Sequence, residues 1–100
     1  MNEFGLSAKD MEAMTALFYQ TPVLDKVVIF GSRAMGNYQA SSDIDLALFG
    51  AFEHKEDLLL KEQLEELPMP YIFDLVVFDA IKSNEFKGHI QRVGKVFYKR

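Results

Sequence analysis

Two aspartates spaced two residues apart, a Gly-Ser turn and a third aspartate inside an apolar run are the residues of this chain that could do chemistry. Asp43 and Asp45 open an expected strand, so their side chains share a face with Cα atoms about 6.5–7 Å apart. Asp74 interrupts an apolar stretch, and Gly31-Ser32 follows a β-branched one. Carboxylates bind divalent metal ions, and the free N–H groups of a turn bind phosphate. The group predicts metal-dependent transfer of a phosphoryl or nucleotidyl group.

The three acids are the expected metal ligands and catalytic residues. Two Mg²⁺ ions about 3.5–4 Å apart can hold both the attacking and the leaving oxygens of such a reaction. Asp43 and Asp45 would bridge both ions. Asp74 would complete the coordination of the ion that binds the acceptor, and it would take the proton of the attacking hydroxyl.

The Gly-Ser turn is expected to bind the phosphates. Gly31 has no Cβ and lets the backbone come close, Ser32 offers an N–H and a hydroxyl, and Arg33 would neutralise charge with its planar fork. The six residues that begin at Gly31 also match the first part of a P-loop, but Asn37-Tyr38 stands where a P-loop has Lys-Ser/Thr. A P-loop also leads straight into a helix, whereas this loop has poor helix content, so we reject that interpretation.

Each residue taken alone has a simpler explanation. A Gly-Ser turn is most often only a turn, and Ser-Asp before a strand is common turn chemistry. Asp74 is harder to explain, because a carboxylate in an apolar run is costly to bury unless it is paired or bound to metal. Its alternatives are an edge-facing position or a salt bridge to Arg33. The hypothesis depends on the combination of residues.

Hydrophobic periodicity and cap signals predict the elements that position these residues. Ser7 and Ser83 are expected helix caps, and five leucines would give the middle helix a broad apolar face: Leu58, Leu59, Leu60, Leu64 and Leu67. The expected elements are helices over residues 7–21, 54–66 and 83–93 and strands over 26–30, 44–49, 71–78 and 95–98, with 31–42 as a loop. Their order favours an α+β two-layer sandwich, a small mixed β-sheet with helices on one face.

Length and composition limit the classes of protein that this chain can represent. One hundred residues, 49% of them hydrophobic, are expected to form one domain over residues 1–100. A net charge of −4 argues against a nucleic-acid-binding surface. The absence of cysteine excludes disulfides and thiolate metal sites and fits the cytoplasm. No stretch approaches the roughly 20 apolar residues of a membrane span, and no secretory signal is visible.

The motif resembles that of a known superfamily. Gly31-Ser32, ten residues and then Asp43-Ile44-Asp45 match the G-S-x10-D-x-D signature of polymerase-beta-like nucleotidyltransferases. The residues that flank both motifs, and the stretch from His89 to Tyr98, resemble those of the minimal nucleotidyltransferase (MNT) family. The resemblance extends from about Lys26 to Tyr98.

This resemblance implies a function and a partner. In such proteins the two motif aspartates and a later strand aspartate bind Mg²⁺, and the Gly-Ser turn holds the nucleoside triphosphate. MNT proteins often pair with a small helical HEPN protein as antitoxin and toxin, and some transfer AMP from ATP to a tyrosine of that toxin. A chain of this length has no room for an acceptor domain, so a partner chain would supply the acceptor, in a homo- or hetero-oligomer.

Two other functions remain open at this stage. The chain could be a non-catalytic antitoxin that neutralises its partner by binding alone. It could also be a nucleotidyltransferase for a small molecule such as an aminoglycoside, although the short chain argues against this. The sequence names neither the nucleotide base nor the acceptor.

Overall fold

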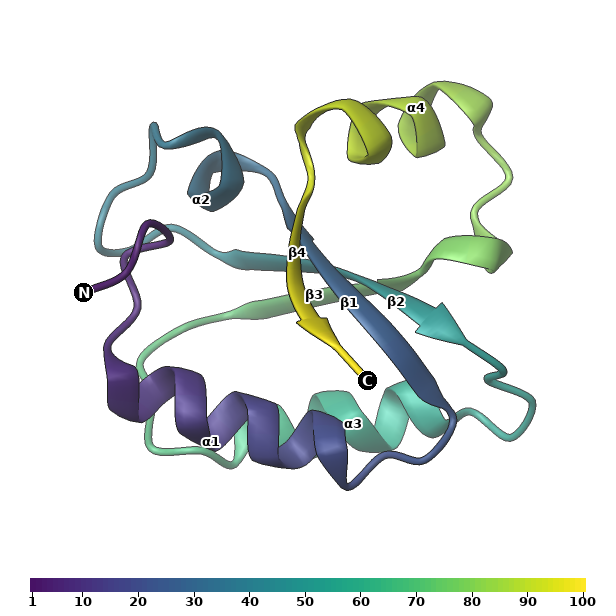
Figure 1. Cartoon of the computed structure of the whole chain (residues 1–100), viewed down its shortest axis with the longest axis horizontal. Coiled ribbons are helices and arrows are strands. Elements are labelled where there is room, and N and C mark those ends of the chain that lie inside the picture. The colour runs from purple at the N-terminus through teal and green to yellow at the C-terminus, as the bar shows by residue number, and fades with distance from the viewer.

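A four-stranded mixed sheet is the centre of the structure, a computed structural model that describes residues 1–100. The strands lie in the order β3-β2-β1-β4; β1 is antiparallel to β2 and β4, and β2 is parallel to β3 (Figure 1). In chain order the elements are α1 (Ala8–Tyr19), β1 (Leu24–Phe30), α2 (Ser32–Met35), β2 (Ile44–Gly50), α3 (Glu56–Glu65), β3 (Phe73–Val77), the 3₁₀ helix η1 (Phe78–Ala80), α4 (Asn84–Val93) and β4 (Lys95–Lys99).

All the predicted helices and strands are present, and their ends differ from the prediction by a residue or two. Both predicted caps form, because Ser7 Oγ accepts a hydrogen bond from the Asp10 N–H and Ser83 Oγ accepts one from the Phe86 N–H. The prediction that residues 31–42 form only a loop is wrong, since α2 makes a helical turn directly after Gly31. A single turn is too short to show hydrophobic periodicity, and this explains why it was not predicted.

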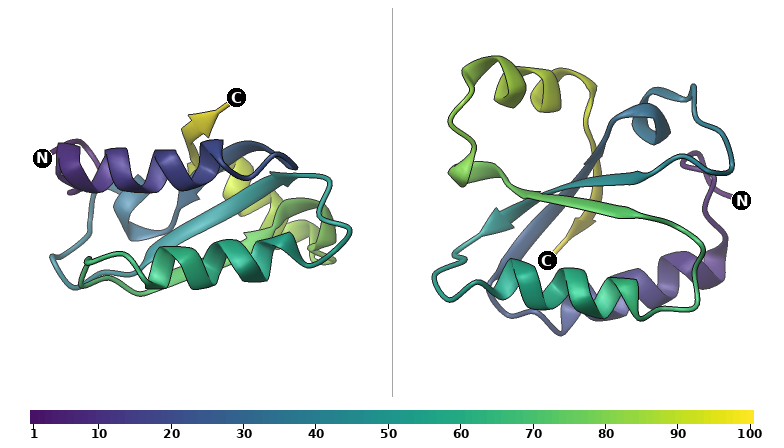
Figure 2. Two further views of the ribbon diagram at one scale, coloured as in Figure 1. Left: turned by 90° about the horizontal axis from the view of Figure 1, so that it is seen from below. Right: turned by 180° about the vertical axis from the view of Figure 1, so that it is seen from behind.

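The main core lies between the sheet and one layer of helices. Figure 2 shows α1 and α3 side by side along one face of the sheet. Phe18 of α1 and Leu64 of α3 pack there against Ile29, Leu46 and other inward strand residues, all fully buried. This face confirms the predicted α+β arrangement of a mixed sheet with a helical layer.

The opposite face carries a smaller apolar cluster under α4, a helix that departs from the prediction of helices on one face only. Ile90 of α4 packs with Val28 and Phe30 of β1, Ala47 of β2 and Phe78. Figure 1 shows α4 on the other side of the sheet from α1 and α3. The sheet is therefore covered on this second face only in part, and the remaining part is where polar side chains of β2 and β3 can meet solvent.

The apolar face of α3 is narrower than its leucines suggest. Leu60 and Leu64 are buried, but Leu58 and Leu59 are each 56% exposed. Positions one and two residues before Leu60 turn away from the sheet, because a helix advances about 100° per residue. No helix has the length and apolar character that crossing a membrane requires.

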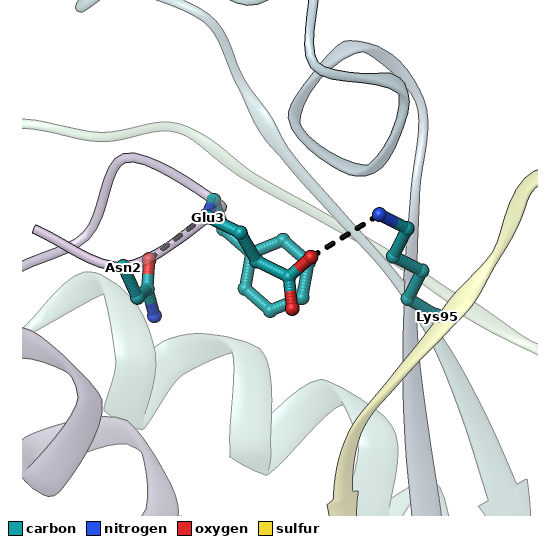
Figure 3. Close-up of polar contacts among 4 residues, drawn as sticks. Asn2, Glu3 and Lys95 are labelled. Atoms are coloured by element: carbon teal, nitrogen blue, oxygen red, sulfur yellow. Dashed lines mark hydrogen bonds and ion pairs between the residues drawn. The ribbon is translucent and has the colours of Figure 1, made fainter.

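The N-terminal segment before α1 packs against the end of the sheet. The side-chain oxygen of Asn2 accepts hydrogen bonds from the N–H groups of Phe4 and Leu6 and so closes a tight turn. Glu3 forms an ion pair of 3.1 Å with Lys95 of β4 (Figure 3). Both partners of this pair are exposed, so it contributes little stability. The buried side chain of Phe4 makes the larger contribution.

Candidate functional site

Asp45 and Asp74 are neighbours across the β2–β3 pair. They are partners in the parallel register of these strands, in which Ile44 also pairs with Phe73. Partners on adjacent strands lie about 4.8 Å apart and point to the same face, and successive side chains alternate between faces. Ile44 and Phe73 belong to the core under α1 and α3, so the two aspartates point to the opposite face, on the side of α4.

The third acid, Asp43, lies directly before β2 and is exposed. Burial raises the pKa of the Asp45 carboxyl above its ordinary value, and the negative charges of Asp74 and then of Asp43 raise it further. All three carboxylates are therefore close enough to interact at one end of the sheet. An Asp74 on the opposite face from Asp45 would have excluded a shared site, and the register does not place it there.

Gly31 brings the Gly-Ser turn against this group of acids. Phe30, the last residue of β1, pairs with Asp45, so the turn that follows begins beside the carboxylate. Gly31 has a φ of +73°, and a Cβ built on it would overlap the Asp45 Oδ2 atom. Both its conformation and the space beside it require glycine. The first N–H groups of α2, from Ser32 onward, have no acceptor within their own helix.

The chemistry of the acids fits a hard divalent cation. Three carboxylates with like charges repel one another, and this repulsion adds to the effect of burial in raising the pKa of Asp45. A cation between them would remove the repulsion. As the side chains stand, however, no group of three or more His, Cys, Asp or Glu residues converges closely enough to hold a metal ion. Carboxylate oxygens are the kind of ligand that Mg²⁺ prefers, but the aspartate side chains would have to move closer together to bind it.

Asp74 is not buried, so the argument that a buried carboxylate needs a charged partner or a metal ion does not apply to it. It lies on β3, which is an edge strand, and its side chain is exposed. The salt bridge to Arg33 considered from the sequence is absent, because the only ion pair in the structure joins Glu3 and Lys95. The edge-facing position considered from the sequence is the one that the structure confirms. Strand order follows from tertiary pairing and could not be read from the apolar run itself.

Arg33 occupies a different place from the phosphate-binding position expected for it. Its side chain is only 1% exposed. Three of its N–H groups donate to the carbonyl oxygens of Phe4, Ala40 and Ser42. A guanidinium that is buried and bonded in this way faces no ligand, so the prediction that Arg33 neutralises phosphate does not agree with the structure.

The cavities of the structure lie away from the acids. The largest, about 460 Å³, is lined by Asp25, Lys26, Phe49, Lys99 and Arg100. The other two lie between α4 and β4 and between the end of α1 and α3. The acids therefore lie on an open surface at the end of the sheet, which a large acceptor can approach more easily than it could a deep pocket.

Sequence reasoning missed the tyrosines that hold Arg33. The guanidinium carbon lies 5.3 Å from the ring centre of Tyr38 and 4.8 Å from that of Tyr71. Tyr38 is in the segment before β2, and Tyr71 lies just before β3. Tyr38 is a near neighbour of Arg33 in the chain, but no spacing in the sequence links either residue to Tyr71, so only the folded chain reveals this cluster.

Comparison with known proteins supports the reading of the motif. The family described as "Polymerase beta, Nucleotidyltransferase" matches residues 12–100. The crystal structure of a toxin–antitoxin with AMP-PNP contains a similar chain, with a TM-score of 0.73 and 22% identity over 90% of this chain and 73% of that one. A chain of the toxin–antitoxin MntA–HepT matches with a TM-score of 0.68 and 20% identity over 94% and 74% of the two chains. At these identities the similarity establishes the fold. No curated protein sequence matches this chain.

Proposed function

The chain belongs to the polymerase beta nucleotidyltransferase family, and from this premise we propose that it transfers AMP from ATP to a hydroxyl group of a partner protein in a Mg²⁺-dependent reaction. The observation that carries the proposal is the pairing of Asp45 with Asp74 on one face of the sheet, with Gly31 directly against Asp45. A turn with free N–H groups beside several carboxylates can bind a triphosphate together with its cations. Residues 1–100 are taken as the single domain that supplies this site.

Asp43, Asp45 and Asp74 are the residues that would hold two Mg²⁺ ions. Bound Mg²⁺ would supply charge neutralisation on the phosphates and would lower the pKa of the attacking hydroxyl. The exposed position of Asp43 and the open end of the sheet leave room for the triphosphate beside these carboxylates. Gly31 and Ser32 would hold the phosphates through backbone N–H groups and the serine hydroxyl.

The transfer itself is a displacement at phosphorus. The acceptor oxygen attacks the α-phosphorus of ATP, the bond from that phosphorus to the oxygen bridging the β-phosphate breaks, and pyrophosphate leaves. Asp74 would accept the proton of the attacking hydroxyl. Because Asp74 is exposed on an edge strand, a hydroxyl on the surface of another protein can reach it.

The proposed acceptor is a HEPN-type helical protein, with this chain as its antitoxin. The toxin–antitoxin structures that share this fold support the pairing, and the one with AMP-PNP supports an adenine nucleotide as donor. The acids lie on an open surface and line none of the cavities, an arrangement that suits a protein acceptor better than a small molecule. We further propose a cytoplasmic location, a hetero-oligomer with that partner, and no role in nucleic-acid or membrane binding.

Incubation with labelled ATP tests the proposal. The purified chain, the product of the neighbouring gene, Mg²⁺ and ATP labelled in the α-phosphate should give a labelled partner. The variant Asp43→Asn should lose the label, whereas Asp25→Asn, an exposed aspartate at the opposite end of β1, should keep it. A wild-type reaction that labels nothing would contradict the catalytic proposal.

A non-catalytic antitoxin is the second candidate, and one observation favours it. The acids do not form a ready metal site as they stand. If binding alone neutralises the partner, Asp45→Ala will still protect cells that express it. Loss of protection in that variant, with the complex still formed, would instead support transfer.

A further inference from the structure

Arg33 is the largest fully buried side chain of the protein and carries a charge. It has no acidic partner, because the only ion pair in the structure joins Glu3 and Lys95. A buried charge is costly unless hydrogen bonds replace its hydration. An apolar side chain at this position would avoid the free-energy cost of burying a charge. The presence of Arg33 therefore indicates that its hydrogen bonds have a role in the protein.

The hydrogen bonds of Arg33 hold the segment that leads to the acids. Its Nε donates to the Ser42 carbonyl at 3.0 Å and its Nη2 to the Ala40 carbonyl at 3.2 Å. Ser42 directly precedes Asp43. The Nη1 of Arg33 donates to the Phe4 carbonyl at 2.8 Å, so the N-terminal segment is fixed to the same guanidinium. The planar guanidinium can make these bonds in fixed directions, which an ammonium cannot.

Two tyrosine rings complete the arrangement around the guanidinium. Tyr38, from the same segment, and Tyr71, from the approach to β3, both lie within cation–π distance of Arg33. The backbone near Tyr71 is also joined to the start of β2, since the Ile44 N–H donates to the Ile72 carbonyl. Arg33 therefore contacts both segments that lead to the acids, the one before β2 and the one before β3. Arg33 itself lies in α2, the helix that begins at the Gly-Ser turn.

We propose that Arg33 is a positioning residue that fixes Asp43 and the start of β3 relative to the Gly-Ser turn, through its bonds to the Ala40 and Ser42 carbonyls and its contact with Tyr71. It does not touch the nucleotide. This inference rests on the proposed function, because the geometry it maintains is useful only if the acids bind metal and phosphate.

The variants Arg33→Lys and Arg100→Lys separate positioning from general stabilisation. Arg100 is a matched control, since its guanidinium also donates to backbone carbonyls, at Phe18, Tyr19, Thr21 and Leu24, but at the other end of the sheet. The measurements are melting temperature, amide hydrogen exchange of residues 36–43 and affinity for Mn²⁺ alone. Both variants are expected to melt below the wild type.

Only Arg33→Lys should weaken Mn²⁺ binding, by about tenfold or more, and speed exchange at Ser42 and Asp43, because misplaced ligands lose affinity steeply. A folded Arg33→Lys with wild-type exchange and Mn²⁺ affinity would overturn the inference, as would equal losses in Arg100→Lys. If Arg33→Lys does not fold, Tyr71→Leu carries the same comparison. A wild type that binds Mn²⁺ neither alone nor with ATP would refute the metal-dependent function, and exchange alone would then decide whether Arg33 orders the segment.

Discussion

The glycine beside Asp45 offers the sharpest test of the site. Gly31→Ala introduces a Cβ that overlaps the Asp45 carboxylate, and it also forces alanine into a φ of +73°. Gly36→Ala is the matched control, since Gly36 has a φ of +85° but its Cβ would meet nothing within 4 Å. Both variants place an alanine at a positive φ, but the ψ of −159° at Gly31 belongs to a region that only glycine adopts readily, whereas Gly36, with a ψ of 1°, is left-handed α. Gly31→Ala therefore combines a larger backbone cost with the contact with Asp45, and Gly36→Ala has the left-handed cost alone.

The expected magnitudes follow from these two terms. The left-handed conformation of Gly36 costs an alanine about 1–2 kcal/mol, which lowers the Tm of a domain of this size by about 4–8 °C per kcal/mol. Gly31→Ala should lower the Tm further, because its backbone conformation favours glycine more strongly and its new methyl group overlaps Asp45. Only Gly31→Ala should displace Asp45, and a misplacement of about 1 Å can reduce the rate by roughly 100-fold.

Two assays check this prediction. Thermal unfolding measures the loss of stability in each variant, and transfer from labelled ATP to the partner, with Mn²⁺ binding beside it, measures the effect on the site. Gly36→Ala should retain near wild-type transfer once it is assayed well below its Tm. Equal transfer by both variants would show that the contact between Gly31 and Asp45 has no part in the chemistry, and the reasoning would be refuted.

Three further predictions concern stability. Asp45→Asn should raise the Tm at pH 7, because the pKa of the half-buried Asp45 is raised in the folded state and its charged form therefore destabilises the fold. This cost is absent below the ordinary pKa of aspartate and grows as pH rises through the folded pKa, so the gain over the wild type should disappear at about pH 3. Leu64→Ala should cost about 2–5 kcal/mol in urea unfolding, whereas Leu59→Ala, at a site 56% exposed, should change stability by less than about 0.5 kcal/mol. Ser83→Ala should cost about 0.5–2 kcal/mol, since it removes the acceptor of the Phe86 N–H, and a stabilising or neutral result would contradict the capping role.

Local signals account for the parts of the fold that the sequence predicted well. Ser7 and Ser83 cap helices where their hydroxyls can reach N–H groups three residues on, a relation that depends on neighbours in the chain. The strands follow from short apolar runs bounded by Gly, Pro or polar turns, as in β1 before Gly31. The one-turn helix α2 gave no such signal.

Burial was predicted less well, because it depends on which elements become neighbours. Leu59 and Leu64 belong to the same leucine-rich helix, yet only Leu64 meets the sheet. The apolar run around Asp74 left its burial open, and the edge-facing alternative is confirmed because β3 lies at the edge. Arg33 was expected at a ligand and lies instead among carbonyl oxygens from distant segments.

The sequence by itself determined the motif of the candidate site, because the G-S-x10-D-x-D pattern fixes a glycine turn and two carboxylates within a short stretch of chain. The tertiary structure decided that Asp74 joins them, through the parallel register that pairs it with Asp45. It also decided that Arg33 lies beneath the site and not in it. The physical reason is that spacing along the chain determines which side chains share one face of a strand. Strand order and side-chain packing between segments depend instead on contacts among residues far apart in the chain.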